Sequence, residues 1–234
     1  LAYYRIARQL MPAVYLDNVA FGPAWFVHVE PDAEIPQFVV SKRVVAPPGV
    51  DLGPFATQAD ANRFVDILED AFDLCRYHHI LEQVPHGQPC AYFEMGRCPA
   101  PCNATIPMSS YRQTVAAALA FALGDRGEVF AAWETEMQQA SARLEFEQAA
   151  MVRQRLDRAR SIERASFGQV RDLRAFRYLV VQRGPGRTRV KPFFVRGGWI
   201  EPGEIARLKD LDDVVPAWLA EMDKPAASLP EHVS

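Results

Sequence analysis

The sequence predicts an α+β protein assembled from several modules. Three observations predict this class. Alternating apolar and polar residues near both ends of the chain are typical of strands, residues 58–74 and 126–164 carry apolar side chains at helical spacing, and four cysteines gather in one stretch. The strand pairs and the helices occupy separate segments, so the class is α+β.

The composition is that of a globular protein. Of the 234 residues, 49% are hydrophobic and 24% are charged, which excludes wholesale disorder, a collagen and a disulfide-dense scaffold. The longest nearly uncharged apolar run, residues 114–123, is about half the length that spans a bilayer. No basic-then-apolar leader opens the sequence, so we expect a cytoplasmic protein without a membrane partner.

The N-terminal quarter predicts a helix and a strand pair. Residues 1–10 have helical spacing and stop before Pro12. Two alternating runs, 24–30 and 37–45, are separated by Pro31-Asp32 and predict a β-hairpin or two neighbouring strands.

A turn and two helices follow. Gly53-Pro54-Phe55 predicts a turn, after which Thr57 can cap a helix that runs to about residue 74. Its apolar positions recur at three and four residues and predict one buried face: Phe64, Ile67, Leu68, Ala71 and Phe72. Beyond the cysteine stretch, Ser110 with Gln113 predicts a capping box for a helix over residues 111–123, which Gly124 ends.

Four cysteines, Cys75, Cys90, Cys98 and Cys102, lie within 28 residues. A chain of this size folds without disulfides, and four converging thiolates are what a tetrahedral zinc ion or an iron–sulfur cluster requires. Only Cys98-Pro-Ala-Pro-Cys102 has the tight spacing of a zinc knuckle, so the wide, unequal gaps favour iron–sulfur.

Zinc stays the alternative ligand, and a third interpretation is four small buried residues without a metal. That third interpretation is weakened because Cys90, Cys98 and Cys102 stand among Gly, Pro and Arg. Three histidines share the region, and a surface role is favoured over ligation for each: His78, His79 and His86.

Residues 126–164 predict two helices hinged near residues 142–145. Each helix carries a narrow apolar stripe: Val129, Trp133, Met137 and Ala140 on the first, and Phe146, Ala149, Ala150, Val152 and Leu156 on the second. Because neither stripe is wide enough to bury itself, we expect an antiparallel helical hairpin that completes its core on a partner. The alternative is a hairpin packed on its own chain.

A basic strip follows. Residues 153–196 hold thirteen Lys and Arg against three acids, although the whole chain has a net charge of −3. Residues 176–182 and 188–195 predict a second β-hairpin, interleaved with Phe176, Tyr178, Phe193 and Phe194. The strip predicts DNA binding, with a solvated face as the alternative, and the hairpin supplies its candidate contacts: Arg183, Arg187, Arg189, Lys191 and Arg196. A short helix over residues 217–222 and a loose tail are expected at the end.

The cysteine stretch resembles a known motif. Residues 88–102, Gln-Pro-Cys-Ala-Tyr-Phe-Glu-Met-Gly-Arg-Cys-Pro-Ala-Pro-Cys, resemble the cysteine motif of UvrC, the incision subunit of bacterial nucleotide excision repair. Upstream, Gly53-Pro54-Phe55 followed by a helix and Leu74-Cys75 is similar to the segment that leads into the family's first cysteine. Residues 190–198, Val-Lys-Pro-Phe-Phe-Val-Arg-Gly-Gly, resemble the first strands of its RNase H-like half.

The helical pair resembles the UVR motif with which that family docks on UvrB. The pattern runs from Met137 through Ala140, Leu144, Phe146, Glu147, Ala149 and Ala150 to Arg153. The resemblance implies a four-cysteine iron–sulfur cluster of the 4Fe-4S type and a hairpin that pairs with the UVR hairpin of UvrB. The docking residues that it implies are Met137, Leu144, Phe146, Glu147, Ala150 and Arg153.

The nuclease sites of the family are incomplete here. Its GIY-YIG domain needs paired tyrosines, an arginine and a metal-binding glutamate, yet residues 1–15 resemble only the final helix, with Tyr3 about where the glutamate would stand. Metal-assisted phosphodiester cleavage needs such carboxylates. Asp210, Asp212 and Asp213 do not stand in the catalytic context of the RNase H-like half and are interpreted as surface acids or helix caps.

These observations predict a UvrC-like repair component that binds UvrB and DNA without a complete nuclease site, and they leave open whether it is an enzyme. The alternative is a stand-alone adaptor with a structural or redox-sensing cluster. The expected modules are a GIY-YIG remnant with a strand pair (1–57), a helix with the cysteine region (58–124), the UVR hairpin (125–165), a basic β-hairpin (166–208) and a tail (209–234).

Overall fold

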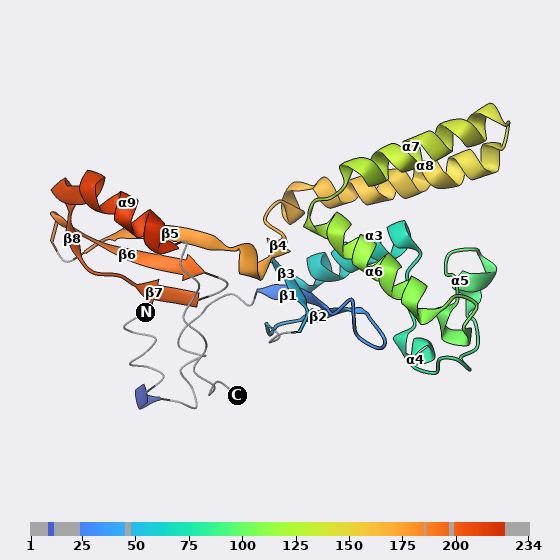
Figure 1. Ribbon diagram of the computed structural model, residues 1–234, viewed down its shortest axis with the longest axis horizontal. Coiled ribbons are helices and arrows are strands. Elements are labelled where there is room, and N and C mark those ends of the chain that lie inside the picture. The colour runs from blue at the N-terminus through green and yellow to red at the C-terminus, as the bar shows by residue number, and fades with distance from the viewer. Residues whose placement is uncertain (1–8, 12–23, 45–47, 185, 197–198, 223–234) are drawn as a thin grey trace.

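The computed structural model describes residues 9–11, 24–44, 48–184, 186–196 and 199–222. The predicted helix over residues 1–10 lies almost wholly outside the described residues, as do Tyr3, Val45, Gly198 and the predicted tail after Met222. The described part is α+β, with two antiparallel sheets and helices packed beside them (Figure 1). None of the helices described is long and apolar enough to cross a bilayer.

The first sheet has the strand order β2-β1-β3-β4, and all of its neighbours are antiparallel. Its strands are β1 (Trp25–Val29), β2 (Phe38–Ser41), β3 (Val50–Phe55) and β4 (Arg171–Asp172). The β1–β2 pair confirms the predicted hairpin, with each strand shorter than predicted. β4 comes from far along the chain, so it joins the C-terminal part to this sheet.

The segment Gly53-Pro54-Phe55 is the end of β3, so the prediction of a turn there is wrong. Trp25 pairs with Phe55 and Val27 with Leu52, which leaves β3 with one extra residue between the two pairs. A bulge of this kind accepts a proline, because the missing N–H is not needed in the ladder. Phe55 is buried in the core and Pro54 is exposed.

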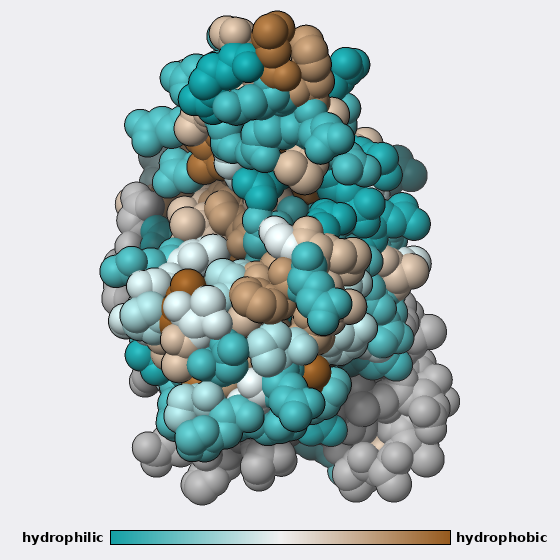
Figure 2. Space-filling model, turned by 90° about the vertical axis from the view of Figure 1, so that its right-hand side faces the viewer, coloured by the Kyte–Doolittle hydropathy of each residue, from teal (hydrophilic) through white to brown (hydrophobic). Residues whose placement is uncertain are grey.

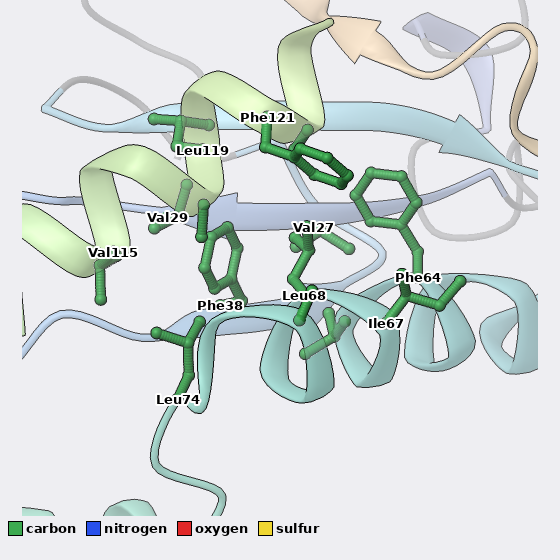
Figure 3. Close-up of a cluster of buried hydrophobic side chains, with 14 of the residues drawn as sticks. Val27, Val29, Phe38, Phe64, Ile67, Leu68, Leu74, Val115, Leu119 and Phe121 are labelled. Carbon is green, nitrogen blue, oxygen red and sulfur yellow. The ribbon is translucent and has the colours of Figure 1, made fainter. Parts of the chain in front are cut away.

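Helix α3 (Gln58–Phe72) begins as predicted. The backbone N–H of Asp60 donates to the Thr57 hydroxyl oxygen at 3.1 Å, and Asp73, in the left-handed conformation, ends the helix just before the predicted limit. The predicted apolar face meets β1, β2 and helix α6 (Met108–Leu123) in the main core (Figure 3). Burial of this face holds the first sheet and α6 against α3.

Helix α6 begins three residues earlier than predicted. Pro107 has an extended backbone, and the N–H groups of Ser110 and Tyr111 both donate to its carbonyl. Ser110 therefore lies inside the first turn, and the predicted capping box of Ser110 with Gln113 is wrong. Gly124, with a φ of 125°, ends the helix as predicted.

Helices α7 (Gly127–Ala142) and α8 (Phe146–Arg160) form the predicted antiparallel hairpin. It projects away from the sheets, and its base lies along α3 (Figure 1). Leu144, with a φ of 62°, makes the connecting turn. Near the base, Val152, Leu156 and Ala159 are buried, so this half of the hairpin packs on its own chain.

The second sheet has the order β5-β6-β7, with β8 paired to β6. Its strands are β5 (Arg177–Arg183), β6 (Arg189–Arg196), β7 (Trp199–Pro202) and β8 (Ala206–Arg207). β5 and β6 confirm the predicted second hairpin, whereas β7 and β8 were not predicted. Helix α9 (Leu211–Met222) covers one face of this sheet and begins six residues before the predicted helix. Asp212 and Asp213 occupy its first turn, where acids suit the helix dipole.

Candidate cysteine site and docking hairpin

The cysteines lie in a loop that leaves α3 at Asp73 and re-enters a long helix at Met108. The loop contains two one-turn helices, α4 (His78–Leu81) and α5 (Ala91–Glu94), and a 3-10 turn at Pro101–Asn103. Gly87 ties the loop together, because its N–H donates to the Cys102 carbonyl at 3.0 Å. A Cβ at Gly87 would lie 2.7 Å from the Ile80 carbonyl oxygen, so no larger residue fits there without a shift.

Three of the four cysteines are buried. Cys75, Cys98 and Cys102 are at most 7% exposed, Cys90 is partly exposed, and all four are free thiols. The Cys75 backbone N–H donates to the hydroxyl of Tyr111 at 3.1 Å. Because Tyr111 is itself buried on α6, this bond joins the start of the loop to the core.

The thiols influence one another. A hydrogen bond between the side chains of Cys75 and Cys98 raises the pKa of Cys75 and lowers the pKa of Cys98 to about 7. Burial raises the pKa of Cys102, and nearby Cys98 and Cys90 add to that rise. The structure thus brings Cys75 and Cys98 together, with Cys102 in electrostatic range of both and Cys90 in electrostatic range of Cys102. No group of three or more His, Cys, Asp or Glu side chains in the described ranges is arranged to hold a metal ion.

The three histidines differ in their surroundings. His79 and His86 are exposed, as expected for surface residues. His78 is half-buried, burial lowers its pKa, and its Nδ1 has no hydrogen-bond partner within the described structure. It lines a crevice too narrow for a water molecule together with Cys75 and Glu69, so it lies beside the first of the four cysteines.

A cluster of ion pairs joins the cysteine loop to the hairpin. Asp70, only 6% exposed, binds Arg76, Arg97 and Arg158, which come from the loop's start, its middle and helix α8. Arg76 follows Cys75 in sequence and Arg97 precedes Cys98. Sequence reasoning missed this cluster, and its only local signal is an acid placed among the apolar positions of α3.

A second ion pair also joins the end of α3 to α8. Asp73 binds Arg155 of α8, and the guanidinium of Arg155 lies over the ring of Trp133 at 5.8 Å. The two carboxylates, together with Arg155 and Arg158 of α8, line a cavity of about 250 Å³ between α3, the loop and the hairpin. The base of the hairpin is therefore held by both apolar packing and ion pairs.

The tip of the hairpin, by contrast, exposes apolar side chains. Leu144 is 71% exposed and Phe146 64%, whereas Met151, which is 58% exposed, lies farther along α8 and lines the cavity beside Asp70. Figure 2, which faces this end of the molecule, shows hydrophobic residues gathered at the top, where α7 and α8 meet. Of the six residues predicted to dock, Met137 is partly buried and the other five are exposed: Leu144, Phe146, Glu147, Ala150 and Arg153.

Most of the residues of the basic β-hairpin that were predicted to contact DNA have exposed side chains. Arg183, Arg187 and Arg189 are exposed and Lys191 is partly exposed. Arg196 is buried instead: its guanidinium binds Glu201 and donates to the Glu221 carbonyl of α9. The structure therefore places Arg196 between the sheet and α9, and we leave it out of the proposed DNA surface.

Comparison with known families assigns two parts of the chain. Residues 24–121 match the model described as the UvrC/Cho excinuclease middle domain, and residues 132–162 match the UvrB/uvrC motif. The chain belongs to the UvrC family. The middle-domain match covers β1 to α6 with the cysteine loop, and the motif match covers the hairpin. Together the two matches take in more than half of this UvrC-family chain.

Curated relatives agree with this assignment. A UvrABC system protein C of Rhodopseudomonas palustris (strain BisB5) is 28% identical over 234 residues, which cover 96% of this chain and 33% of the relative. That of Syntrophotalea carbinolica is 29% identical over 175 residues, 75% of this chain and 26% of the relative. The UvrC-family chain thus spans about a third or less of the relatives' length. No solved structure matches it.

Proposed function

We propose that this chain is the central docking part of a UvrC-type excinuclease subunit in bacterial nucleotide excision repair. It binds UvrB through the hairpin tip and DNA through the basic β-hairpin, and we assign no cutting step to its described residues. The observation that carries the proposal is the exposed apolar tip, at Leu144 and Phe146, on a motif whose family description names both UvrB and UvrC.

The difference between the packed base of the hairpin and its exposed tip supports docking through the tip. At the base, α8 is buried against α3 and its arginines bind Asp70 and Asp73. Since the base is already held, the hairpin can present Phe146 and Leu144 without folding onto a partner first. A second apolar helix pair would remove these side chains from water, at a gain of about 1.5–3 kcal/mol for each large side chain fully buried.

The cysteine site is proposed to hold an iron–sulfur cluster, with zinc as the alternative. The donor set supports this, because four free cysteines from one loop supply four sulfur ligands and Cys98 gives up its proton readily. Cys75, Cys90, Cys98 and Cys102 would be the ligands. Such a cluster supplies a rigid cross-link and can exchange electrons. The chain's own contribution is to hold the loop against α3 and α6 through Arg76, Arg97 and Tyr111.

The DNA surface is proposed for the exposed end of the second sheet. Arg183, Arg187 and Arg189 lie at or beside the β5–β6 turn with their side chains in solvent, and Lys191 follows on β6. Four cations within nine residues give a local field that attracts phosphates, although the whole chain is slightly acidic.

The proposal is tested by titrating purified UvrB into the full chain in a calorimeter. Phe146→Ala is expected to weaken binding at least tenfold, because a large exposed apolar side chain at the centre of the tip is lost. Leu219→Ala, which removes a similar side chain that is 54% exposed on α9, is the matched control and is expected to bind as the wild type does. Equal affinities for all three proteins would overturn the docking assignment.

A further inference from the structure

Among the described residues, one helix covers one face of the second sheet. Helix α9 packs on β5, β6 and β8 (Figure 1), and on that side Val190, Phe194 and Arg196 of β6 are buried. Burial alternates along β6, so the residues between these positions face the opposite side. We call that opposite side the open face. Its residues on β6 are Arg189, Lys191, Phe193 and Val195.

Cross-strand register extends the open face over the neighbouring strands. Tyr178 of β5 and Ile200 of β7 both pair with Val195, and Val180 of β5 pairs with Phe193. Directly paired residues share a face. Tyr178 is 42% exposed, Val180 49% and Ile200 47%, so water reaches a large apolar surface here.

Cations lie beside aromatic rings on the open face and next to it. The rings of Phe176 and Tyr178 are in contact, with centroids 5.6 Å apart, and the guanidinium of Arg171 lies 5.6 Å from the Phe176 centroid. On β6, the Lys191 ammonium lies 5.8 Å from the Phe193 centroid. Rings flanked by cations in this way suit nucleic-acid bases, which stack on the rings while their phosphates meet the charges.

Two arginines stand opposite each other at the basic end of the open face. Arg189 of β6 pairs directly with Arg207 of β8, and both are exposed. Like charges directly opposite across a ladder are destabilising. No Asp or Glu occupies the open-face positions described on these strands, which are 178, 180, 182, 189, 191, 193, 195, 200, 202 and 207. An anion between the two guanidinium groups would offset their repulsion.

We propose that the open face binds single-stranded DNA, with bases stacked on Tyr178 and Phe193 and a backbone phosphate held between Arg189 and Arg207. The inference deepens the proposed DNA binding, on which it rests. A single strand is favoured over a duplex because stacking on a flat sheet needs bases whose faces are free, and in a duplex those faces are covered by neighbouring base pairs. In this arrangement the chain reads no sequence, since stacking accepts every base.

The test measures binding of the full chain to a fluorescent 20-nucleotide oligo-dT and to a 20-base-pair duplex by anisotropy. The single strand is expected to bind more tightly. Tyr178→Ala and Phe193→Ala are each expected to weaken oligo-dT binding by about 5- to 100-fold, the range for loss of one base–aromatic stack. Tyr178→Phe, which keeps the ring, is expected to retain most of the affinity.

Two further variants separate the inference from the proposed function. Val181→Ala removes a side chain that is 41% exposed on the other face of β5, and it is expected to leave oligo-dT affinity unchanged. Arg189→Ala with Arg207→Ala is expected to flatten the dependence of affinity on salt. If this double variant weakens binding and the aromatic variants do not, the DNA surface stands and stacking is wrong. If neither kind of variant changes the affinity, the DNA surface is wrong as well. Tighter binding of the duplex would also overturn the inference.

Discussion

Asp70 of α3 and Arg158 of α8 form an ion pair that joins the hairpin to the cysteine loop, because the same carboxylate also binds Arg76 and Arg97. Asp70 is 6% exposed, and a carboxylate so deeply buried is stable only when it is fully partnered. Arg76 and Arg97 each stand next to a cysteine. One side chain therefore fixes the loop and the hairpin relative to each other.

Asp70→Asn is expected to lower the free energy of unfolding by about 2–3 kcal/mol. Removing one partner of a buried pair costs about 3–5 kcal/mol, and here the cost is smaller because Arg97 and Arg158 are half-exposed and can be hydrated. Chemical denaturation measures the change. Asp66→Asn, at an exposed position of the same helix, serves as the control, and an equal loss in both variants would show that Asp70 has no special role.

The free energy of unfolding is expected to fall as the pH rises from about 4.5 to 7, because Glu69 ionises over this range. Burial raises the pKa of Glu69 from 4.5 to about 7, against the opposing effect of Arg76, so the folded state holds this proton more tightly than the unfolded chain. The stabilisation is thus complete below pH 4.5 and is lost as the pH rises through 7.

The glutamine introduced by Glu69→Gln cannot ionise. The free energy of unfolding of this variant is therefore expected to exceed that of the wild type by up to about 3 kcal/mol at pH 8 and to match it at pH 4. Urea denaturation at the two pH values measures the difference. A difference that does not change with pH would contradict the role of Glu69.

Gly87→Ala is expected to loosen the cysteine loop. The added methyl would meet the Ile80 carbonyl at 2.7 Å and the Cys102 side chain at 3.0 Å, so the loop must shift. Faster reaction of the buried thiols with a thiol reagent and a lower melting temperature would report the shift. Gly127→Ala, where a Cβ meets nothing within 4 Å, is the matched control and is expected to behave as the wild type. Identical thiol reactivity in both variants would refute the close packing at Gly87.

Anaerobically purified protein is expected to contain about four iron atoms and matching sulfide per chain, with the broad visible absorption of a cluster. Cys98→Ser is expected to lose most of the iron, because one of the four proposed thiolate ligands is removed. Iron, sulfide and zinc assays on the same sample distinguish the alternatives. A colourless wild type with one zinc per chain would show that the cysteines bind a structural zinc ion and not a cluster. A wild type free of both metals would refute the metal site.

Sequence reasoning found the elements whose signals are local. Thr57 caps α3, Gly124 ends α6, and the hairpin turn falls where the two apolar stripes break. It failed where a distant strand decides the conformation. Pro54 lies in β3 because the bulge opposite β1 accommodates it, and nothing within a few residues of Pro54 indicates this.

Side-chain partners were the least predictable part of the candidate site. Arg196 belongs to the same basic strip as Arg189, yet it is buried against Glu201 and α9, while Arg189 is exposed. Alternation along β6 separates the two faces, and only the position of α9 shows which face is covered. The Asp70 cluster likewise joins residues up to 88 positions apart, a separation at which charge patterns carry no signal.

The most direct test of the account is hydrogen exchange of the full chain with and without purified UvrB. We predict that UvrB slows exchange at residues 143–150, which include the exposed tip residues Leu144 and Phe146, and leaves α3 and the second sheet unchanged. Protection confined to the second sheet, or no protection anywhere at saturating UvrB, would contradict the assignment of the hairpin as the docking element.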